Sequence, residues 1–266
     1  MRGEGEYEGV QARYYNEYFS GVPGDLEFYL EVAASAGKGG VLELGSGTGR
    51  ILLPLAISGV PVVGLERSPE MLRLARRNLK AAQAESQQRV ELVRGDMREF
   101  SLGRQFSLII APYRTFQHLL SPVDQRGALR CIREHLEPGG LFVFNVFDPL
   151  RDLADRAWSD DRELRKDLEF EDPKTGEVVE VWYRRDYDLI HQLLQQELIF
   201  RRLAEGGGEV SSVPTRLVLR YAGRFEMEHL LEAENLRVRT LYGGFRGEPY
   251  AGYGEQVWTV ERPLLD

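Results

Sequence analysis

Short apolar runs alternate with amphipathic stretches over the first 150 residues of the chain. The apolar runs predict strands, and the stretches between them predict helices because their apolar residues recur with helical spacing. The expected strands are Val41–Leu44, Pro61–Leu65, Val90–Arg94, Phe106–Ala111 and Leu141–Phe147. The expected helices are Asp25–Ala36, Arg50–Ser58, Pro69–Glu85, Gln117–Leu120 and Pro122–Leu136. Strands that are apolar throughout and alternate with helices are typical of a parallel sheet covered on both faces.

The alternation changes near Asp148-Pro149, and antiparallel strands are expected from about Asp167 to Tyr221. They form two hairpins, one around a Pro-Gly turn at 172–176 and one around the triple glycine at 206–208. A helix at Met227–Glu234 and a hairpin of Leu236–Tyr242 with Gln256–Glu261 complete the chain. We therefore predict an α/β fold with a doubly wound, seven-stranded, mostly parallel sheet and an inserted antiparallel β element. Residues 1–150 form the expected core, 151–224 the insertion, and 225–266 the last helix and closing hairpin.

Composition narrows the classes of function. The formal net charge of −8 argues against a nucleic-acid backbone or an anionic membrane as the main partner, because such binding relies on Lys and Arg clusters. The single cysteine, Cys131, excludes an internal disulfide and a Cys-rich zinc site, and its helical pattern predicts a small buried side chain. No apolar run approaches the ~18 residues of a membrane span, so we expect a soluble cytoplasmic protein without a bound metal.

The most specific signal lies between Val41 and Arg50. An apolar strand leads into three glycines that alternate with two hydroxyl residues, and an apolar helix follows: Gly45, Ser46, Gly47, Thr48 and Gly49. This order places backbone N–H groups and a helix N-terminus at the carboxyl end of a strand, where a ligand can bind. Glycine is needed because the chain takes positive φ and because a Cβ would block close approach. Glu43 precedes the first glycine, and the resulting spacing differs from the Gly-x-Gly-x-x-Gly of dinucleotide sites.

Two further acids end neighbouring strands of the predicted sheet. Glu66 can accept hydrogen bonds from both hydroxyls of a ribose, a role that nicotinamide enzymes also use. Asp96 can accept from the exocyclic amine of an adenine while the N–H of Met97 meets a ring nitrogen. The alternatives are a surface charge for Glu66 and a helix N-cap for Asp96. A nicotinamide site does not require the second acid, and Glu43 would repel a pyrophosphate but balance an ammonium and a sulfonium.

With these motifs the chain resembles the class I S-adenosylmethionine-dependent methyltransferases. The resemblance covers the Rossmann-like core and the closing hairpin, and it is specific for the cofactor but not for the substrate. It implies glycines around the methionine part of S-adenosylmethionine, Glu66 on the ribose, and Asp96 with Met97 at the adenine. The pair Tyr14-Tyr15 is similar to an aromatic lid, and the insertion is similar to that of the small-molecule branch, which includes amino-sugar and glycine N-methyltransferases. The cofactor-binding residues implied are Tyr14, Glu43, Gly45, Ser46, Gly47, Gly49, Glu66, Arg67, Asp96, Met97 and Ala111.

In this family the end of the fourth strand lies beside the transferable methyl group. Enzymes that methylate amines of nucleic acids carry Asn/Asp-Pro-Pro-Tyr there, whereas this chain has Ala111-Pro112-Tyr113-Arg114, which argues against DNA or RNA. His118 and Tyr113 are the candidate catalytic residues, and a structural role of His118 in a short helix stays open. An amine acceptor needs only to be neutral, whereas a hydroxyl needs a base within reach.

One loop and three further histidines are also considered. The loop 242–253 is either a wall of the substrate site or a mobile surface loop. His135 and His229 lie among charged helix residues and are expected to be exposed, while His191 is a weaker candidate for a pocket in the insertion.

We expect methyl transfer to an N or O atom of a small-molecule acceptor by in-line displacement, in which the protein aligns the nucleophile and excludes water. The alternatives are a non-catalytic S-adenosylmethionine-binding sensor, which uses the inserted sheet as an interface, and a nicotinamide oxidoreductase. The exposed edges of the inserted sheet suggest a homodimer formed through it.

Overall fold

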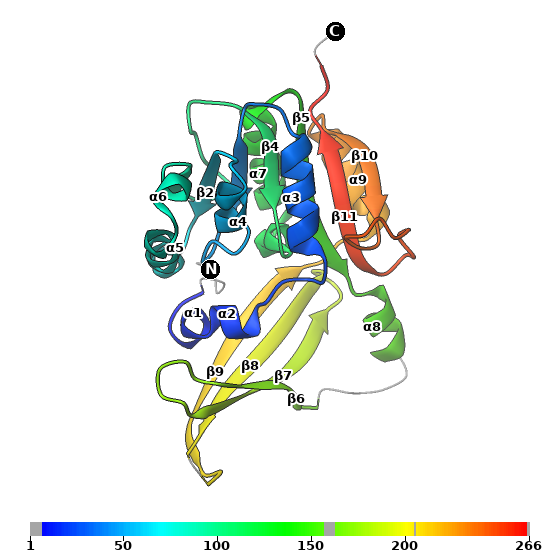
Figure 1. Ribbon diagram of the computed structural model, residues 1–266. Coiled ribbons are helices and arrows are strands. Elements are labelled where there is room, and N and C mark those ends of the chain that lie inside the picture. The colour runs from blue at the N-terminus through cyan, green and yellow to red at the C-terminus, as the bar shows by residue number, and fades with distance from the viewer. Residues whose placement is uncertain (1–6, 157–162, 205, 265–266) are drawn as a thin grey trace.

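The computed structural model describes residues 7–156, 163–204 and 206–264, which form two sheets (Figure 1). The larger sheet has seven strands in the order β10-β11-β5-β4-β1-β2-β3, and the smaller has four in the order β6-β7-β8-β9. Strands β1 to β5 pair in parallel, whereas β11 runs antiparallel to both β5 and β10. The predicted doubly wound sheet with an antiparallel insertion is confirmed.

The strands of the larger sheet are β1 (Val41–Leu44), β2 (Val62–Glu66), β3 (Val90–Arg94), β4 (Phe106–Ala111), β5 (Leu136–Asp148), β10 (Arg237–Tyr242) and β11 (Gly254–Glu261). Those of the smaller sheet are β6 (Arg165–Glu171), β7 (Val178–Asp188), β8 (Leu193–Leu203) and β9 (Glu209–Arg220). The helices are α1 (Val10–Arg13), α2 (Tyr15–Tyr18), α3 (Asp25–Ser35), α4 (Leu52–Ile57), α5 (Pro69–Ala81), α6 (Ala84–Gln87), the 3₁₀ turn η1 (Thr115–His118), α7 (Pro122–His135), α8 (Leu150–Arg156) and α9 (Arg224–Ala233).

Alternation along the strands divides the core into two layers. In β4, Ile109 packs with α7 and α9 on one face, while Leu108 and Ile110 pack with α3 and α4 on the other. Neighbouring strands follow the same rule, with Phe142 and Phe144 on the first face and Val143 on the second. Each fully buried side chain of this size stabilises the fold by roughly 1.5–3 kcal/mol. The apolar strands are therefore fixed in register by both layers.

The smaller sheet lies against the carboxyl ends of the parallel strands. Figure 1 shows it below the larger sheet, with α1 and α2 beside it. The side chain of Gln117 in η1 donates to the carbonyls of Phe147 and Arg220, each at 3.1 Å, and so ties the end of β5 to the end of β9. The edge at which a doubly wound sheet binds its ligands is thereby enclosed.

Several expected boundaries differ from the observed ones. The helix expected over Pro69–Glu85 breaks because Ala82 is extended, with φ −79° and ψ 166°, and α6 follows as a separate turn. Strand β5 begins at Leu136, which pairs with Phe106, although the sequence predicts a strand only from Leu141. The expected helix near Gln117 is the 3₁₀ turn η1, and the short helices α1, α2 and α8 are unpredicted.

Two helical side chains also differ from expectation. His135 is buried, because its Nε2 accepts from the N–H of Leu102 at 3.0 Å and its Nδ1 donates to the carbonyl of Cys131 at 2.7 Å. Cys131 is half-buried rather than buried, and its Sγ donates to the carbonyl of Arg98. His229 is exposed, as expected.

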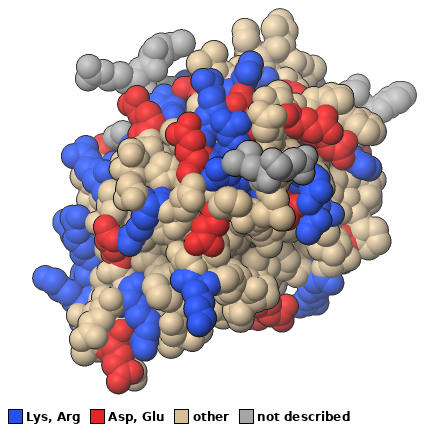
Figure 2. Space-filling view, turned by 90° about the horizontal axis from the view of Figure 1, so that it is seen from above, with Lys and Arg blue, Asp and Glu red and all other residues tan. Residues whose placement is uncertain are grey.

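The described surface carries charges of both signs. Figure 2 shows acidic and basic side chains interspersed over the face seen from above. Within the described ranges, no helix is long and apolar enough to span a bilayer. The same residues contain no cluster of three or more His, Cys, Asp or Glu side chains arranged to hold a metal ion.

Candidate functional site

A cavity of about 210 Å³ lies at the carboxyl ends of β1 to β4, and we call it the cofactor cavity. Its wall includes eight of the residues that the sequence singles out: Gly45, Gly47, Glu66, Arg67, Asp96, Met97, Tyr113 and His118. These residues come from four separate turns of the chain. The parallel topology brings the turns together because all four follow strands that end at the same edge.

The glycine turn forms one wall of the cofactor cavity. Gly45, Gly47 and Gly49 have φ of +64°, +55° and +90°, which side chains with a Cβ rarely adopt. A Cβ on Gly45 would lie 2.6 Å from Cγ2 of Thr115, so the missing side chain lets η1 approach the turn. The N–H of Gly45 donates to the carbonyl of Leu65 at 2.8 Å and fixes the turn against β2. The turn is thus a cradle that a larger residue would fill.

Glu66 stands at the end of β2 with both carboxylate oxygens engaged by backbone donors. Its Oε2 accepts from Gly47 N–H at 2.9 Å and its Oε1 accepts from Ser68 N–H at 2.7 Å. Burial raises the pKa of Glu66 above its usual value, although the hydrogen bonds from Ser68 and Gly47 oppose the shift. The carboxylate retains lone pairs for a pair of hydroxyl donors at the cavity wall.

Asp96 faces the same cavity but has an unpredicted partner. Arg98 donates to it from Nε at 3.0 Å, from Nη2 at 2.6 Å and from its own N–H at 3.0 Å. Burial acts to raise the pKa of Asp96, but the hydrogen bonds and charge of Arg98 outweigh it and hold the pKa below its usual value. No helix follows Asp96, so the N-cap alternative does not apply.

Glu43 and Ser46 lie beneath the glycine turn instead of on the cavity wall. Both are 3% exposed, and Oε2 of Glu43 and Oγ of Ser46 have no hydrogen-bond partner among the described residues. Burial raises the pKa of Glu43 to about 8, although the charge of Arg50 acts against this shift. Orphaned buried polar atoms next to an open cradle fit a cationic ligand in this cavity.

The aromatic residues at the N-terminus are placed differently from the prediction. Tyr14 is 1% exposed and does not line the cavity, because its hydroxyl donates to Oδ2 of Asp172 at 2.7 Å. Tyr15 and Tyr7 line it instead. Tyr7 escaped the sequence analysis, although the Tyr-rich start of the chain was a signal for it. Three other predicted residues lie behind the wall: Ser46, Gly49 and Ala111.

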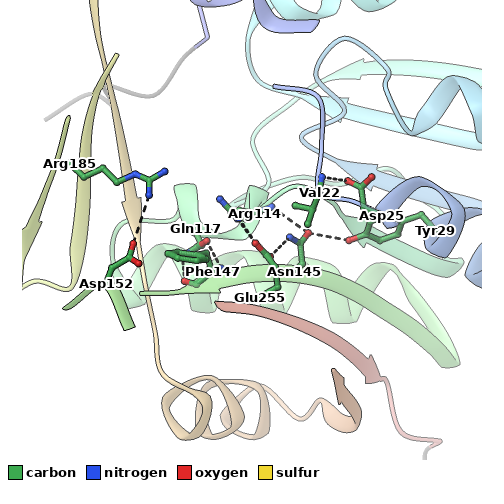
Figure 3. Close-up of polar contacts among 10 residues, drawn as sticks. All are labelled: Val22, Asp25, Tyr29, Arg114, Gln117, Asn145, Phe147, Asp152, Arg185 and Glu255. Atoms are coloured by element: carbon green, nitrogen blue, oxygen red, sulfur yellow. Dashed lines mark hydrogen bonds and ion pairs between the residues drawn. The ribbon is translucent and has the colours of Figure 1, made fainter. Parts of the chain in front are cut away.

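A second cavity of about 260 Å³, which we call the acceptor cavity, lies between the end of β5 and the smaller sheet. Leucines of the smaller sheet, Leu194, Leu217 and Leu219, make one side apolar. Arg185 and Gln196 contribute polar groups, and Figure 3 shows Arg185 turned toward Asp152 of α8, 3.8 Å away. The two cavities share three wall residues: Tyr7, Tyr113 and His118.

The shared wall carries no charge at neutral pH. The hydroxyl of Tyr7 lies 3.3 Å from Nε2 of His118, and their rings meet edge to face at 5.6 Å. Burial lowers the pKa of His118 to about 4, and the charge of Arg67 acts in the same direction. Burial also raises the pKa of Tyr7 well above its usual value. His118 is half-buried and lines both cavities.

A strained turn positions Tyr113 at this wall. Tyr113 and the next residue, Arg114, have φ of +54° and +64°, a conformation that costs about 1–3 kcal/mol for each non-glycine residue. The guanidinium of Arg114 pairs with Glu255 on β11, which also accepts from Nδ2 of Asn145 at 2.9 Å (Figure 3). Tyr29 donates to Asn145 at 3.3 Å and completes this network. Asn145 and Glu255 are positioning residues that sequence reasoning missed, although a polar Asn within an apolar strand was a signal.

The remaining candidates lie away from both cavities. The loop 242–253 lines neither of them, because Phe245 packs against Phe28 and Tyr29 while the Tyr250 hydroxyl donates to Asp148 at 2.6 Å. His191 is exposed and pairs with Asp188 at 2.7 Å.

Residues 41–140 match a family described as a methyltransferase domain. This part of the chain is similar to methyltransferase domains. It contains β1 to β4, the start of β5 and the wall residues that the sequence predicts.

Curated relatives align with this segment and, in one case, beyond it. Over 103 residues, 39% of the chain, it is 38% identical to the dTDP-3-amino-3,6-dideoxy-alpha-D-glucopyranose N,N-dimethyltransferase of Streptomyces fradiae. The chain spans 37% of the length of that relative. The cypemycin N-terminal methyltransferase of a Streptomyces species is 27% identical over 221 residues, 83% of this chain and 81% of that protein.

Solved structures extend the likeness to the insertion. The CcbJ methyltransferase from Streptomyces caelestis has a TM-score of 0.82 and 29% identity, covering 99% of this chain and 100% of that one. S-adenosylmethionine-bound CalS10, an amino pentose methyltransferase from Micromonospora echinaspora, has a TM-score of 0.71 and 23% identity, covering 98% and 100%, and bears on the fold. These findings confirm the predicted resemblance to amino-sugar N-methyltransferases.

We predict that Gly45→Ala weakens cofactor binding by at least about tenfold, the factor that about 1.4 kcal/mol represents. The new Cβ meets Thr115 at 2.6 Å and displaces η1 from the cavity wall. Titration calorimetry with S-adenosylhomocysteine measures the effect. Gly59→Ala is the matched control, because Gly59 also has positive φ, +96°, but a Cβ there has no neighbour within 4 Å. Equal affinities of the two variants would contradict the prediction.

The buried neutral His118 predicts a pH dependence of stability. The pKa of His118 is about 4 in the folded protein and 6.5 for an unperturbed histidine, which represents the unfolded chain. Between pH 4 and pH 6.5 the unfolded chain therefore binds more protons at this residue than the folded protein does. The contribution of His118 to the free energy of unfolding should therefore be fully present above pH 6.5 and fall as the pH drops towards 4. Glu43, whose pKa burial raises to about 8, acts in the opposite direction over part of this range, so the prediction concerns the difference between wild type and a His118 variant. In urea unfolding over this range, the stability of the wild type relative to His118→Gln should fall as the pH drops. The control His229→Gln, at an exposed site, should show no such pH-dependent difference from the wild type. If the free energy of unfolding has the same dependence on pH in His118→Gln as in the wild type, His118 titrates normally and the prediction is wrong.

Proposed function

We propose that the protein transfers a methyl group from S-adenosylmethionine to the nitrogen of a small-molecule amine. The observation that carries this proposal is the uncharged wall of Tyr7, Tyr113 and His118 that two adjoining cavities share. A donor in the cofactor cavity and an acceptor in the second would meet only there. The reaction needs this juxtaposition, because holding the reactants in line supplies most of the catalysis.

The residues around the cofactor cavity fit this donor. The glycine cradle accommodates the methionine part, Glu66 the ribose hydroxyls, and Asp96 with Met97 the adenine edge. Arg67 and Tyr15 complete the wall, and the buried Glu43 offsets positive charge from beneath the turn. When bound, the sulfonium supplies an electrophilic methyl group.

The chemistry of the shared wall favours an amine over a hydroxyl acceptor. A hydroxyl needs a base, and with a pKa of about 4 the imidazole of His118 is a weak one. An amine needs only a free lone pair. We therefore assign Tyr113, Tyr7 and His118 to aligning the acceptor and excluding water.

The acceptor class that we favour is an amino sugar or a similar amine. The relatives with printed substrates include two N,N-dimethyltransferases of dTDP-linked amino sugars. The acceptor cavity offers apolar leucines on one side and Arg185 and Gln196 on the other, which suits a ring with both polar and apolar faces.

The alternative of a non-catalytic sensor has less support, because a sensor does not require a second cavity at the methyl side. A nicotinamide oxidoreductase is not supported by any of the relatives named above.

Three predictions about the whole protein extend this proposal. We propose a cytoplasmic location, no nucleic-acid partner, and a division into core (1–150), insertion (151–224) and closing segment (225–266). The homodimer through the smaller sheet also remains a prediction, and equilibrium sedimentation that detects only monomer would remove it.

Binding and transfer test the function directly. Wild-type protein should bind S-adenosylhomocysteine in calorimetry, and Glu66→Gln or Asp96→Asn should weaken binding by roughly 10–100-fold, as expected for charge-assisted hydrogen bonds. Glu91→Gln on β3 is the control, because Glu91 is exposed and pairs with Arg104 outside the cavity. Incubation with methyl-labelled donor and a panel of amines that includes amino sugars should label an amine. Absence of binding to the donor and its product would refute the proposal.

A further inference from the structure

Residues 7–19, which we call the strap, cover both cavities. Tyr7 and Tyr15 line the cofactor cavity, and Tyr18 and Phe19 line the acceptor cavity. The strap contains only α1 and α2, each of four residues. Helices of this length are unstable by themselves, so contacts with the rest of the chain must hold the strap in place.

The core holds the strap by few polar contacts. The N–H of Gly9 donates to Glu70 at 3.0 Å, and the hydroxyl of Ser68 donates to the carbonyl of Tyr7 at 3.2 Å. Thr48 donates to Asn16 at 2.7 Å. The donors of these three bonds are uncharged, although the acceptor Glu70 is a carboxylate. The hydroxyl of Tyr7 also lies 3.3 Å from Nε2 of His118.

The inserted sheet holds the strap by a buried carboxylate, that of Asp172 in the β6–β7 turn. Asp172 is 1% exposed, and its Oδ2 accepts from the hydroxyl of Tyr14 at 2.7 Å and from the guanidinium of Arg13. Its Oδ1 accepts from the N–H of Lys174 at 2.9 Å. The contact of Arg13 with Asp172 joins two charged groups at a buried carboxylate, and charge-assisted hydrogen bonds are about twice as strong as neutral ones. Asp167 of β6 also holds the strap, by accepting from the hydroxyl of Tyr18 at 2.7 Å, but this bond is exposed and its donor is uncharged. The Asp172 cluster is therefore the strongest polar attachment of the strap.

Packing reinforces the same attachment. The ring of Tyr14 lies 5.3 Å from that of Phe170 on β6 and 5.8 Å from that of Phe200 on β8. Gln11 donates to Thr215 of β9 at 2.9 Å. Two glycines with positive φ flank residues 10–19 of the strap, Gly9 at +58° and Gly21 at +104°, and glycine is the residue with the greatest backbone freedom.

We propose that Asp172 is a positioning residue that holds the strap closed over the cofactor cavity, so that the inserted sheet sets how fast the cofactor is exchanged. Its link to catalysis rests on the proposed function. Asp172 contacts neither cavity and acts through Tyr14 and Arg13, whose neighbour Tyr15 covers the cofactor cavity.

The test compares Asp172→Asn with wild type in three measurements. Hydrogen exchange monitored by mass spectrometry, without ligand, should become faster in residues 10–19 and stay unchanged in β10 and β11. The dissociation rate of S-adenosylhomocysteine and the KM for S-adenosylmethionine should rise by about tenfold. The kcat at saturating donor should stay within about threefold of wild type, because Asp172 does not touch the reacting groups.

Two further variants distinguish the loss of the strap's attachment at Asp172 from general destabilisation of the fold. Glu171→Gln changes the exposed neighbour of Asp172 and should alter none of the three measurements. The pair Arg13→Gln with Tyr14→Phe removes both strap donors, leaves the Lys174 contact intact, and should reproduce the effects of Asp172→Asn. Unchanged exchange in residues 10–19 in both Asp172→Asn and the pair would overturn the inference, as would equal effects in Glu171→Gln.

These outcomes are distinct from failure of the proposed function. If wild-type protein binds neither the donor nor its product, the function fails, while the exchange measurement without ligand still decides whether Asp172 holds the strap. If the wild type binds the donor and its product, but the hydrogen-exchange and dissociation rates are the same in Asp172→Asn as in the wild type, only the proposed role of Asp172 is refuted.

Discussion

Both cavities depend on the close approach of two turns at the carboxyl edge of the sheet, the turn after β1 and the turn after β4. They touch at Gly45 and Thr115, where a Cβ would leave only 2.6 Å. The first turn presents its backbone to the cofactor cavity, and the second carries Tyr113 and His118, which both cavities share. One missing side chain therefore sets the distance between the surface that would hold the donor and the wall across which the methyl group would pass.

The three acidic residues at this edge of the sheet differ in the partners that stabilise their carboxylates. Asp96 has Arg98 and Glu66 has backbone N–H groups, so both carboxylates are satisfied without a ligand. Glu43 has one unpaired buried oxygen and a pKa of about 8. A positive charge placed in the cradle above it lowers this pKa, since an opposite charge favours the ionised form. The unpaired carboxylate oxygen of Glu43 would therefore be stabilised by a cationic sulfonium ligand in the cavity and destabilised by an anionic pyrophosphate.

Most of the core and half of the site followed from local sequence patterns. The glycine turn, Glu66 and Asp96 are each set by the strand that precedes them, so their placement follows once the strands are identified. Tyr7, Asn145 and Asp172 could not be predicted because their partners are remote in sequence: Tyr7 contacts His118, Asn145 contacts Glu255, and Asp172 contacts Arg13.

His135 was expected to be exposed because its neighbours along the helix are charged. It is buried instead, because the backbone N–H of Leu102, from another segment, donates a hydrogen bond to its ring. Of the predicted lid pair Tyr14-Tyr15, only Tyr15 lines the cofactor cavity, because the hydroxyl of Tyr14 donates to Asp172 of the insertion.

The uncharged wall also bears on the form in which an amine would arrive. An ammonium ion is disfavoured beside Tyr7, Tyr113 and a neutral His118, because desolvation penalises the charged form. The guanidinium of Arg50 lies 5.5 Å from the ring centre of Tyr113 and adds repulsion of the same sign. The acceptor would therefore lose its proton to solvent on entering, before it meets the donor.

After methyl transfer, the positive charge would lie on the methylated nitrogen of the acceptor and no longer on the sulfur of the donor. The proton that is eventually released needs no base at the wall, because a methylated amine is basic enough to keep it until the product leaves. The low basicity of His118 thus matches a reaction in which the proton is exchanged with solvent and not within the site.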